Sequence, residues 1–201
     1  STPLVSVSLI NTTVNANQSA GVECINTDLS IQGGTISANQ FGGVWGNGCE
    51  MSLTNVQIIG NSTPGNGGGI MSANYAPVVN GGVIRENQAD GMGGGVYYWG
   101  LTGREMQMSG VLLEENAALS GGGVYVDAAK ARLDDVTLRD NLALEDGGGI
   151  YVADNNEATL TLRNDSQVGE AGHGNSSDAD GDSSGVGAGI FNIGTLIIEN
   201  S

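Results

Sequence analysis

The sequence predicts an all-β fold, a right-handed parallel β-helix (solenoid) of about seven coils with an internal asparagine ladder. Two repeated patterns support this prediction. An aliphatic residue, two polar residues and an asparagine recur along the chain, as in residues 84–87 and 113–116. A glycine run that ends in a β-branched residue follows, as in residues 93–96 and 121–124.

The spacing of the β-branched residues gives the length of one coil. Intervals of 22, 26, 26, 28, 26 and 40 residues separate Val22, Val44, Ile70, Val96, Val124, Ile150 and Ile190. This period is too short for a pair of helices, and the regular leucine spacing of leucine-rich repeats is absent. Short alternating segments such as residues 51–53 and 159–162 are typical of strands. Three short strands per coil, joined by bends rich in Gly and Asn, account for the period.

We expect one asparagine per coil to bond the asparagine of the next coil inside the solenoid. Coils stack about 4.8 Å apart, so equivalent side chains lie above one another and their amides can bond along the axis. Asparagine also tolerates the left-handed conformation that a tight bend needs. The predicted ladder consists of Asn17, Asn39, Asn61, Asn87, Asn116 and Asn141.

The composition suits a solenoid and excludes several classes of function. Glycine supplies 35 of 201 residues without a Gly-X-Y period, which excludes collagen. Six Lys and Arg against 22 Asp and Glu give a formal net charge of −16, so we expect no nucleic-acid partner. The chain has no apolar run of 18 residues, so we expect no direct membrane insertion of this segment. High acidity fits an extracellular or high-salt setting, where ions screen the self-repulsion of the acidic groups.

Cys24 and Cys49 are predicted to form a disulfide. They fall two residues after Val22 and five after Val44, which places them in adjacent coils near the same bend. Neighbouring backbones about 5 Å apart are within disulfide reach. Such a bond is compatible with an oxidising compartment.

A column of large side chains directly follows the β-branched positions and is predicted to face outward, because side chains alternate along a strand. It consists of Trp45, Met71, Tyr97, Tyr125, Tyr151 and Phe191. Three interpretations are open for this column. It forms a self-stacking ladder or lies under a loop, it contacts another chain side by side, or it is a platform for carbohydrate.

Two charged columns precede the ladder. The first alternates in sign and is predicted to be an ion-pair ladder of Arg85, Glu114 and Arg139. The second contains only acids, namely Glu86, Glu115 and Asp140. We interpret it as a solvated acidic face. The alternative is a carboxyl pair spaced like that of a retaining glycosidase.

The long interval before Ile190 indicates an acidic insertion loop, rich in Gly and Ser, at residues 169–186. Asp178, Asp180 and Asp182 alternate within it, as in loops that bind calcium, so calcium is the one cofactor expected. Gly189 stands where such a loop has its glutamate, and the alternative is a mobile acidic loop. The single histidine, His173, lies in the same segment and builds no zinc pattern.

The combination of aliphatic-x-x-Asn with Gly-Gly-Gly-(Ile/Val) resembles the paired repeats of polymorphic outer-membrane proteins and of bacterial autotransporter passengers. Those repeats have Phe-x-x-Asn and Gly-Gly-Ala-(Ile/Leu/Val), whereas this chain has Ile or Leu for the Phe and Gly for the Ala. The resemblance covers residues 7–200. It implies a β-helix that is exported and has a role in adhesion or at the cell surface.

We therefore expect residues 1–201 to form a single β-helix domain that is part of a longer solenoid. The predicted function is a non-catalytic extracellular or cell-surface structural or adhesive module, such as a fibre or passenger segment. No catalytic residue is assigned. Its expected partners are carbohydrate and other copies of itself, bound end to end or side by side. The alternative is a carbohydrate-active β-helix enzyme, either a polysaccharide lyase or a glycoside hydrolase.

Overall fold

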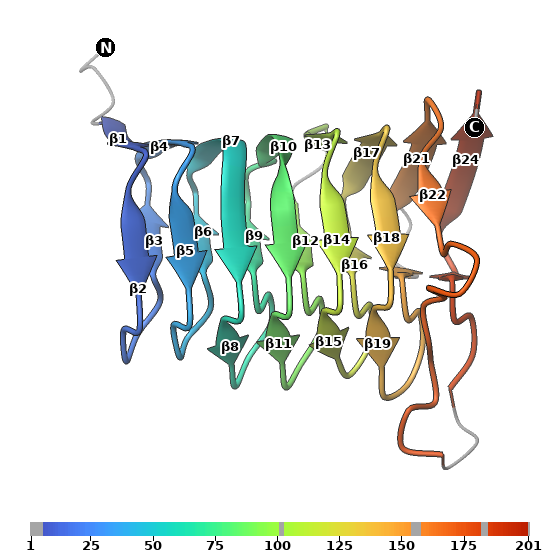
Figure 1. Cartoon of the computed structure of the whole chain (residues 1–201). Helices are drawn as coiled ribbons and strands as arrows, with labels where there is room; N and C mark the ends of the chain where they lie inside the picture. Colours follow the sequence, from blue (N-terminus) through green and yellow to red (C-terminus); the bar gives the residue numbers. More distant parts are fainter. Residues whose placement is uncertain (1–5, 101–102, 154–157, 182–184, 201) are drawn as a thin grey trace.

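The computed structural model describes residues 6–100, 103–153, 158–181 and 185–200. Its strands stack in parallel along one axis, and the chain runs from one end of the stack to the other (Figure 1). The described ranges contain strands and turns but no helix. This arrangement confirms the predicted all-β parallel solenoid.

A 13-stranded sheet covers two sides of the solenoid, because its strands continue around a bend. Its first side, the long sheet, consists of β1 (Ser6–Ile10), β4 (Asp28–Gln32), β7 (Glu50–Ile59), β10 (Val78–Arg85), β13 (Glu105–Ser109), β17 (Lys130–Asp134), β21 (Thr159–Arg163) and β24 (Thr195–Glu199). Its second side adds β2 (Thr13–Asn15), β5 (Thr35–Ser37), β14 (Leu112–Glu114), β18 (Thr137–Arg139) and β22 (Gln167–Val168). Strands β7 and β10 are long enough to contribute to both sides.

A seven-stranded sheet closes the coils. It consists of β3 (Val22–Ile25), β6 (Val44–Asn47), β9 (Ile70–Ala73), β12 (Val96–Trp99), β16 (Val124–Asp127), β20 (Ile150–Val152) and β23 (Ile190–Asn192). Since each coil supplies one of these strands, six full turns lead from β3 to β23, close to the seven coils predicted. A short fourth strand occurs in four coils: β8 (Ser62–Thr63), β11 (Gln88–Ala89), β15 (Ala117–Ala118) and β19 (Leu142–Ala143).

The core is built from columns of side chains that occupy equivalent positions in successive coils. Along β7, Met51 and Leu53 are buried whereas Ser52 between them faces outward, as expected for alternating side chains. The residues that follow the glycine runs point inward as predicted. Solvent reaches none of Val44, Ile70, Val96, Val124 and Ile150.

The asparagine ladder is present along the whole stack. Each predicted ladder residue donates its side-chain amide to Oδ1 of the asparagine one coil further on, at 2.8 to 3.0 Å. The backbone N–H of the same residue donates to that oxygen as well, at 3.0 to 3.1 Å. The last acceptor is Asn175, a seventh member that the sequence did not reveal.

The left-handed conformation at this bend is not on the asparagine, contrary to expectation. It is on the residue before, with φ of 54° at Ala38, 57° at Glu86 and 54° at Glu115. The ladder asparagines keep an ordinary backbone because their amide and N–H must both face the next coil. Asparagine does take the left-handed conformation at the bend between the two sides of the 13-stranded sheet, as at Asn11 and Asn55.

Candidate functional site

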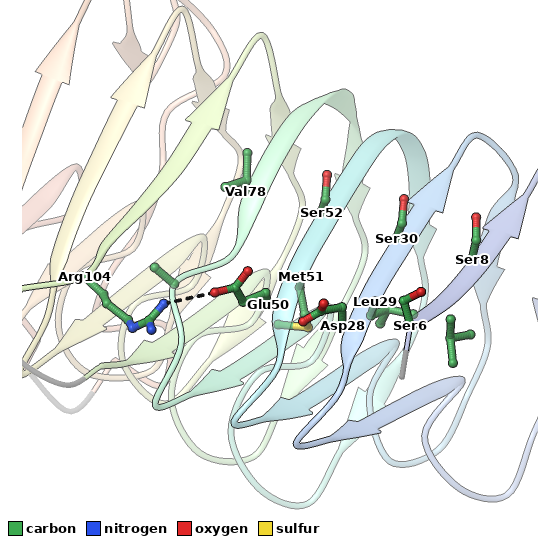
Figure 2. Close-up of a pocket in the computed structure, with 12 residues that line it drawn as sticks. Ser6, Ser8, Asp28, Leu29, Ser30, Glu50, Met51, Ser52, Val78 and Arg104 are labelled. Atoms are coloured by element: carbon green, nitrogen blue, oxygen red, sulfur yellow. Dashed lines mark ion pairs between the residues drawn. The ribbon is translucent and has the colours of Figure 1, made fainter. Parts of the chain in front are cut away.

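A shallow groove of about 480 Å³ lies on the outer face of the long sheet, near the N-terminal end of the solenoid. It crosses β1, β4, β7 and the start of β10 (Figure 2). Ser8, Ser30 and Ser52 are register partners on adjacent strands, so their hydroxyl groups form a row across it. All three serines are exposed. The groove therefore offers a regular series of hydrogen-bonding groups, one per coil.

Charged side chains line one edge of this groove. Asp28 and Glu50 are register partners on β4 and β7. Their carboxylates therefore project from neighbouring strands, whose backbones lie about 4.8 Å apart. Arg104 lies 3.5 Å from the Glu50 carboxylate, and Figure 2 marks this ion pair. The Arg104 guanidinium also stacks on the Tyr75 ring, 3.7 Å from its centre. Within the described residues, Asp28 has no ion-pair partner and its carboxylate remains available to a ligand.

Further along the long sheet, ion pairs connect the coils. Arg132 lies 3.5 Å from Glu105 and 2.9 Å from Asp134. The Arg132 Nε is not aligned for a hydrogen bond, so its contact with Asp134 is an ion pair only. Arg163 lies between Asp134 and Glu199, at 3.7 and 3.5 Å. This network occupies Arg132 and Arg163 on the outer face of the sheet.

The predicted ion-pair ladder beside the asparagines forms only in part. Arg139 pairs with Glu114 at 2.8 Å, as expected, and also with Glu170 at 3.0 Å. Arg85 instead pairs with Glu86, its neighbour in the chain, at 3.1 Å.

The aromatic column faces away from the main core, but much of it is not open to solvent. Tyr97 and Tyr125 are only 8% and 7% exposed, so these two outward-facing residues are covered and not part of an exposed strip. The glycine turns fold over them: a Cβ on Gly93 or Gly121 would lie 2.8 or 3.0 Å from the Cβ of Tyr97 or Tyr125. The middle of the column is a stack that stabilises the sheet, one of the three interpretations.

The rings of the column stack along the solenoid axis. Tyr125 and Tyr151 are nearly parallel, at 5° and 4.5 Å between ring centres, and Tyr151 meets Phe191 at 5.0 Å. The Tyr97 hydroxyl donates to the Asp127 carboxylate at 2.9 Å. Burial, and then the Asp127 charge, raise the pKa of Tyr97 well above its usual range. Burial likewise raises the pKa of Tyr125.

The segment at residues 169–186 is not one continuous loop, because Asn175 and Ser176 rejoin the coil. Asn175 accepts from the Asn141 side chain at 2.9 Å, and Ser176 bridges to Leu142. His173 lies on the excursion before them, where its Nδ1 is 2.8 Å from the Asp140 carboxylate. The segment is thus fixed to the previous coil on both sides of the ladder.

The predicted calcium ligands are only partly described. Asp178 has a left-handed backbone and its carbonyl accepts from Gly181, while Asp182 lies outside the described residues. Among the residues that the structure describes, no group of three or more His, Cys, Asp or Glu is placed to hold a metal ion. Calcium binding stays a prediction for the segment that includes Asp182.

Cys24 and Cys49 are joined by a disulfide, with their Cα atoms 6.2 Å apart. Cys24 lies in β3 and Cys49 directly precedes β7, so the bond connects two neighbouring coils. Both side chains are buried in the core. The disulfide therefore cross-links two neighbouring coils inside the core and is not a reactive site.

Asp28, Glu50 and Arg104 are the site residues that the sequence did not single out. They carry no motif, because the outward positions of the long sheet vary freely from coil to coil. The one available signal is alternation, since an acid, a buried residue and a serine recur in residues 28–30 and 50–52. Arg104 gives no such signal, because it reaches Glu50 from a coil two turns away.

The described part of the chain contains no helix with the length and apolar character needed to cross a bilayer. Comparison with curated proteins and with solved structures gives no match. A family model described as "Right handed beta helix region" matches residues 5–201, nearly the whole chain. Together with the stacked parallel coils and the asparagine ladder, this match shows that the chain belongs to the right-handed β-helix family.

Proposed function

We propose that this chain is a non-catalytic structural or adhesive module of an extracellular or cell-surface protein, such as a segment of a fibre or passenger. In this role it presents the groove of the long sheet to a partner. The observation that carries the proposal is that the arginine side chains are already paired with acidic side chains of the protein. Every arginine of the chain forms an ion pair within the molecule: Arg85, Arg104, Arg132, Arg139 and Arg163.

This pairing matters because enzymes that cleave acidic polysaccharides need positive charge against the substrate. Here the arginines neutralise the protein's own carboxylates, and the net charge stays at −16. Such a surface repels polyuronates. A rigid stack with internally paired charges is better suited to holding a shape and displaying a face than to chemistry on an anionic chain.

The groove itself favours weak, repeated contacts. Its serine hydroxyls repeat once per coil, and the Asp28 carboxylate adds one acceptor. A neutral glycan or an extended polypeptide offers hydrogen-bonding groups with a comparable repeat, so either can follow the row of serines. The disulfide between Cys24 and Cys49 supports an oxidising location, which agrees with the proposed place outside the cell.

One observation favours the second candidate, a carbohydrate-active enzyme. Asp28 and Glu50 lie on neighbouring strands in the groove, and their strand spacing is close to the 5 to 5.5 Å between the carboxyl groups of retaining glycosidases. A neutral polysaccharide would meet no charge repulsion there. Glu50 is however paired with Arg104 at 3.5 Å, so one carboxylate of the two already interacts with a basic group of the protein.

An activity assay separates the two candidates. The purified chain is incubated with a panel of neutral and acidic polysaccharides, and both reducing ends and unsaturated products are measured. We expect no turnover on any of them, and binding of immobilised glycans or surface proteins that weakens in the Ser30→Trp variant, which fills the groove. Turnover that disappears in both Asp28→Asn and Glu50→Gln, but not in the control Glu86→Gln, would overturn the proposal in favour of the enzyme.

A further inference from the structure

We infer that a second pocket, on the seven-stranded sheet around Trp45, binds a small organic cation that carries a quaternary ammonium group. The pocket has a volume of about 300 Å³ and lies at the N-terminal end of the aromatic column. Its main walls are Glu23, Phe41, Trp45, Asn66 and Met71. It is separate from the groove of the long sheet, so the inference does not depend on the proposed function.

The register of the strands builds this pocket. Glu23, Trp45 and Met71 are consecutive register partners on β3, β6 and β9. They occupy the same outward column that continues with Tyr97 and Tyr125. With coils about 4.8 Å apart, the Glu23 carboxylate lies beside the Trp45 indole and the Met71 thioether lies on its other side.

The column is covered in its middle and partly accessible at both ends, since Tyr151 and Phe191 are half-buried like Trp45 and Met71. Tyr97 and Tyr125 are buried, whereas Trp45 and Met71 are half-buried and Glu23 is exposed. Phe41 comes from the turn that follows the ladder and has 53% of its surface exposed. Two aromatic side chains thus line a space that solvent reaches.

The charge of the pocket selects a cation. Glu23 forms no ion pair within the described residues, and neither Lys nor Arg is among the residues that line the pocket. A cation over the face of Trp or Phe is attracted by the ring quadrupole, and an adjacent carboxylate adds direct charge attraction. The net charge of −16 raises the local concentration of cations and repels anions.

The polar walls argue for a ligand without hydrogen-bonding needs. Asn66 Oδ1 already accepts from the backbone N–H of Met92 at 2.9 Å. Thr63 Oγ1 accepts from the backbone N–H of Gly65 at 3.2 Å. These two oxygens are therefore already used, although Ser19 and Glu23 also line the pocket. A quaternary ammonium group needs no hydrogen-bond partner and is attracted by the Glu23 carboxylate and the aromatic rings, which is why we assign this class of ligand.

Fluorescence measures the binding directly, because the chain has 2 Trp, Trp45 and Trp99. In the Trp99→Phe variant the tryptophan fluorescence comes from Trp45 alone. Choline chloride is titrated into this protein at constant ionic strength, with sodium chloride as the reference titrant. We expect a saturable change in Trp45 emission. Adding Glu23→Gln or Phe41→Ala should weaken choline binding about fivefold or more, since each removes one attraction to the cation.

Controls keep the result interpretable. Glu50→Gln removes an acid from the other groove and should leave choline binding unchanged. Glu23 and Phe41 are exposed, so unchanged thermal melts are expected to show that their variants fold. The inference is overturned if choline gives no saturable change, if Glu23→Gln binds choline equally well, or if methyl glucoside binds more tightly than choline.

Discussion

The side-chain amide of Asn87 donates to Oδ1 of Asn116 at 3.0 Å, and the backbone N–H of Asn87 donates to the same oxygen at 3.1 Å. Asn116 in turn donates to the Ile84 carbonyl and to Oδ1 of Asn141, both at 2.9 Å. Its side chain is completely buried. One amide group therefore satisfies backbone and side-chain groups in three successive coils, where no water is available as a substitute.

The first prediction concerns this residue. Asn116→Ala should lower the free energy of unfolding by about 1 to 3 kcal/mol, because it leaves buried donors and acceptors unpaired. Urea denaturation followed by circular dichroism measures the change. Asn80→Ala is the matched control, since Asn80 faces solvent on β10 and should alter stability by less than about 0.5 kcal/mol.

Position along the ladder gives a second comparison. Asn17 makes the same bonds to Asn39 but is itself exposed, so Asn17→Ala should cost less than Asn116→Ala. Equal stability of the Asn116 and Asn80 variants would show that the ladder does not stabilise the solenoid.

The repeated parts of the fold are predictable from the sequence because each coil needs the same residues. Valine or isoleucine after a glycine run recurs because every coil fills one core position. Asn87 or Asn116 recurs because each ladder position uses both an amide donor and an amide oxygen. Asn175 was missed because the chain has additional residues before it. Seven positions separate it from Val168, against three between Leu138 and Asn141, although Val168 and Leu138 are register partners.

The candidate sites were less predictable for a physical reason. Outward side chains such as Asp28 and Glu23 are not constrained by stacking, so no periodic signal marks them. The burial of Tyr97 depends on how the Gly93 turn folds back, which alternation along a strand does not reveal. Alternation gives the direction of a side chain, whereas its exposure depends on the turns that cover it.

The second set of variants tests the close approach of the glycine turns. A Cβ on Gly95 would lie 2.5 Å from the Gly123 carbonyl oxygen and 3.2 Å from the Leu113 side chain. Gly95→Ala should therefore destabilise the protein by about 1 to 3 kcal/mol through overpacking. Gly174→Ala is the control, because a Cβ there meets nothing within 4 Å. Similar melting temperatures for both variants would contradict the packing of these turns.

The third prediction concerns the disulfide. Cys24 and Cys49 are 25 residues apart, and a cross-link of this length typically contributes about 2 to 4 kcal/mol by restricting the unfolded chain. Calorimetry of the Cys24→Ser/Cys49→Ser double variant should show this loss. A reducing agent should destabilise the natural chain but not the double variant. Two free thiols after alkylation under non-reducing conditions would disprove the bond.

The last prediction concerns alkaline stability and rests on Tyr98, which solvent does not reach. Burial raises the pKa of Tyr98 to about 12, although the Arg104 charge acts in the opposite direction. The unfolded value is about 10, so between these two pH values the folded protein retains a proton that the unfolded chain releases. The free energy of unfolding must then fall as pH rises through this window, whereas below pH 10 the contribution of Tyr98 is complete.

Tyr98→Phe removes the Tyr98 share of this titration and should make the fall in stability between about pH 10 and 12 less steep. Tyr97 and Tyr125, whose pKa values burial also raises, account for a remaining slope. Urea denaturation at closely spaced pH values measures the slope, and the variants are compared with the natural chain. Tyr75→Phe is the control, because Tyr75 is half-buried and lies outside the core. The hydroxyl of Tyr98 is 3.5 Å from the Arg104 carbonyl, so its loss shifts the baseline little and leaves the slope as the informative quantity. A slope that Tyr98→Phe does not change would mean that Tyr98 titrates alike in the folded and unfolded chains, and it would contradict the raised pKa of Tyr98.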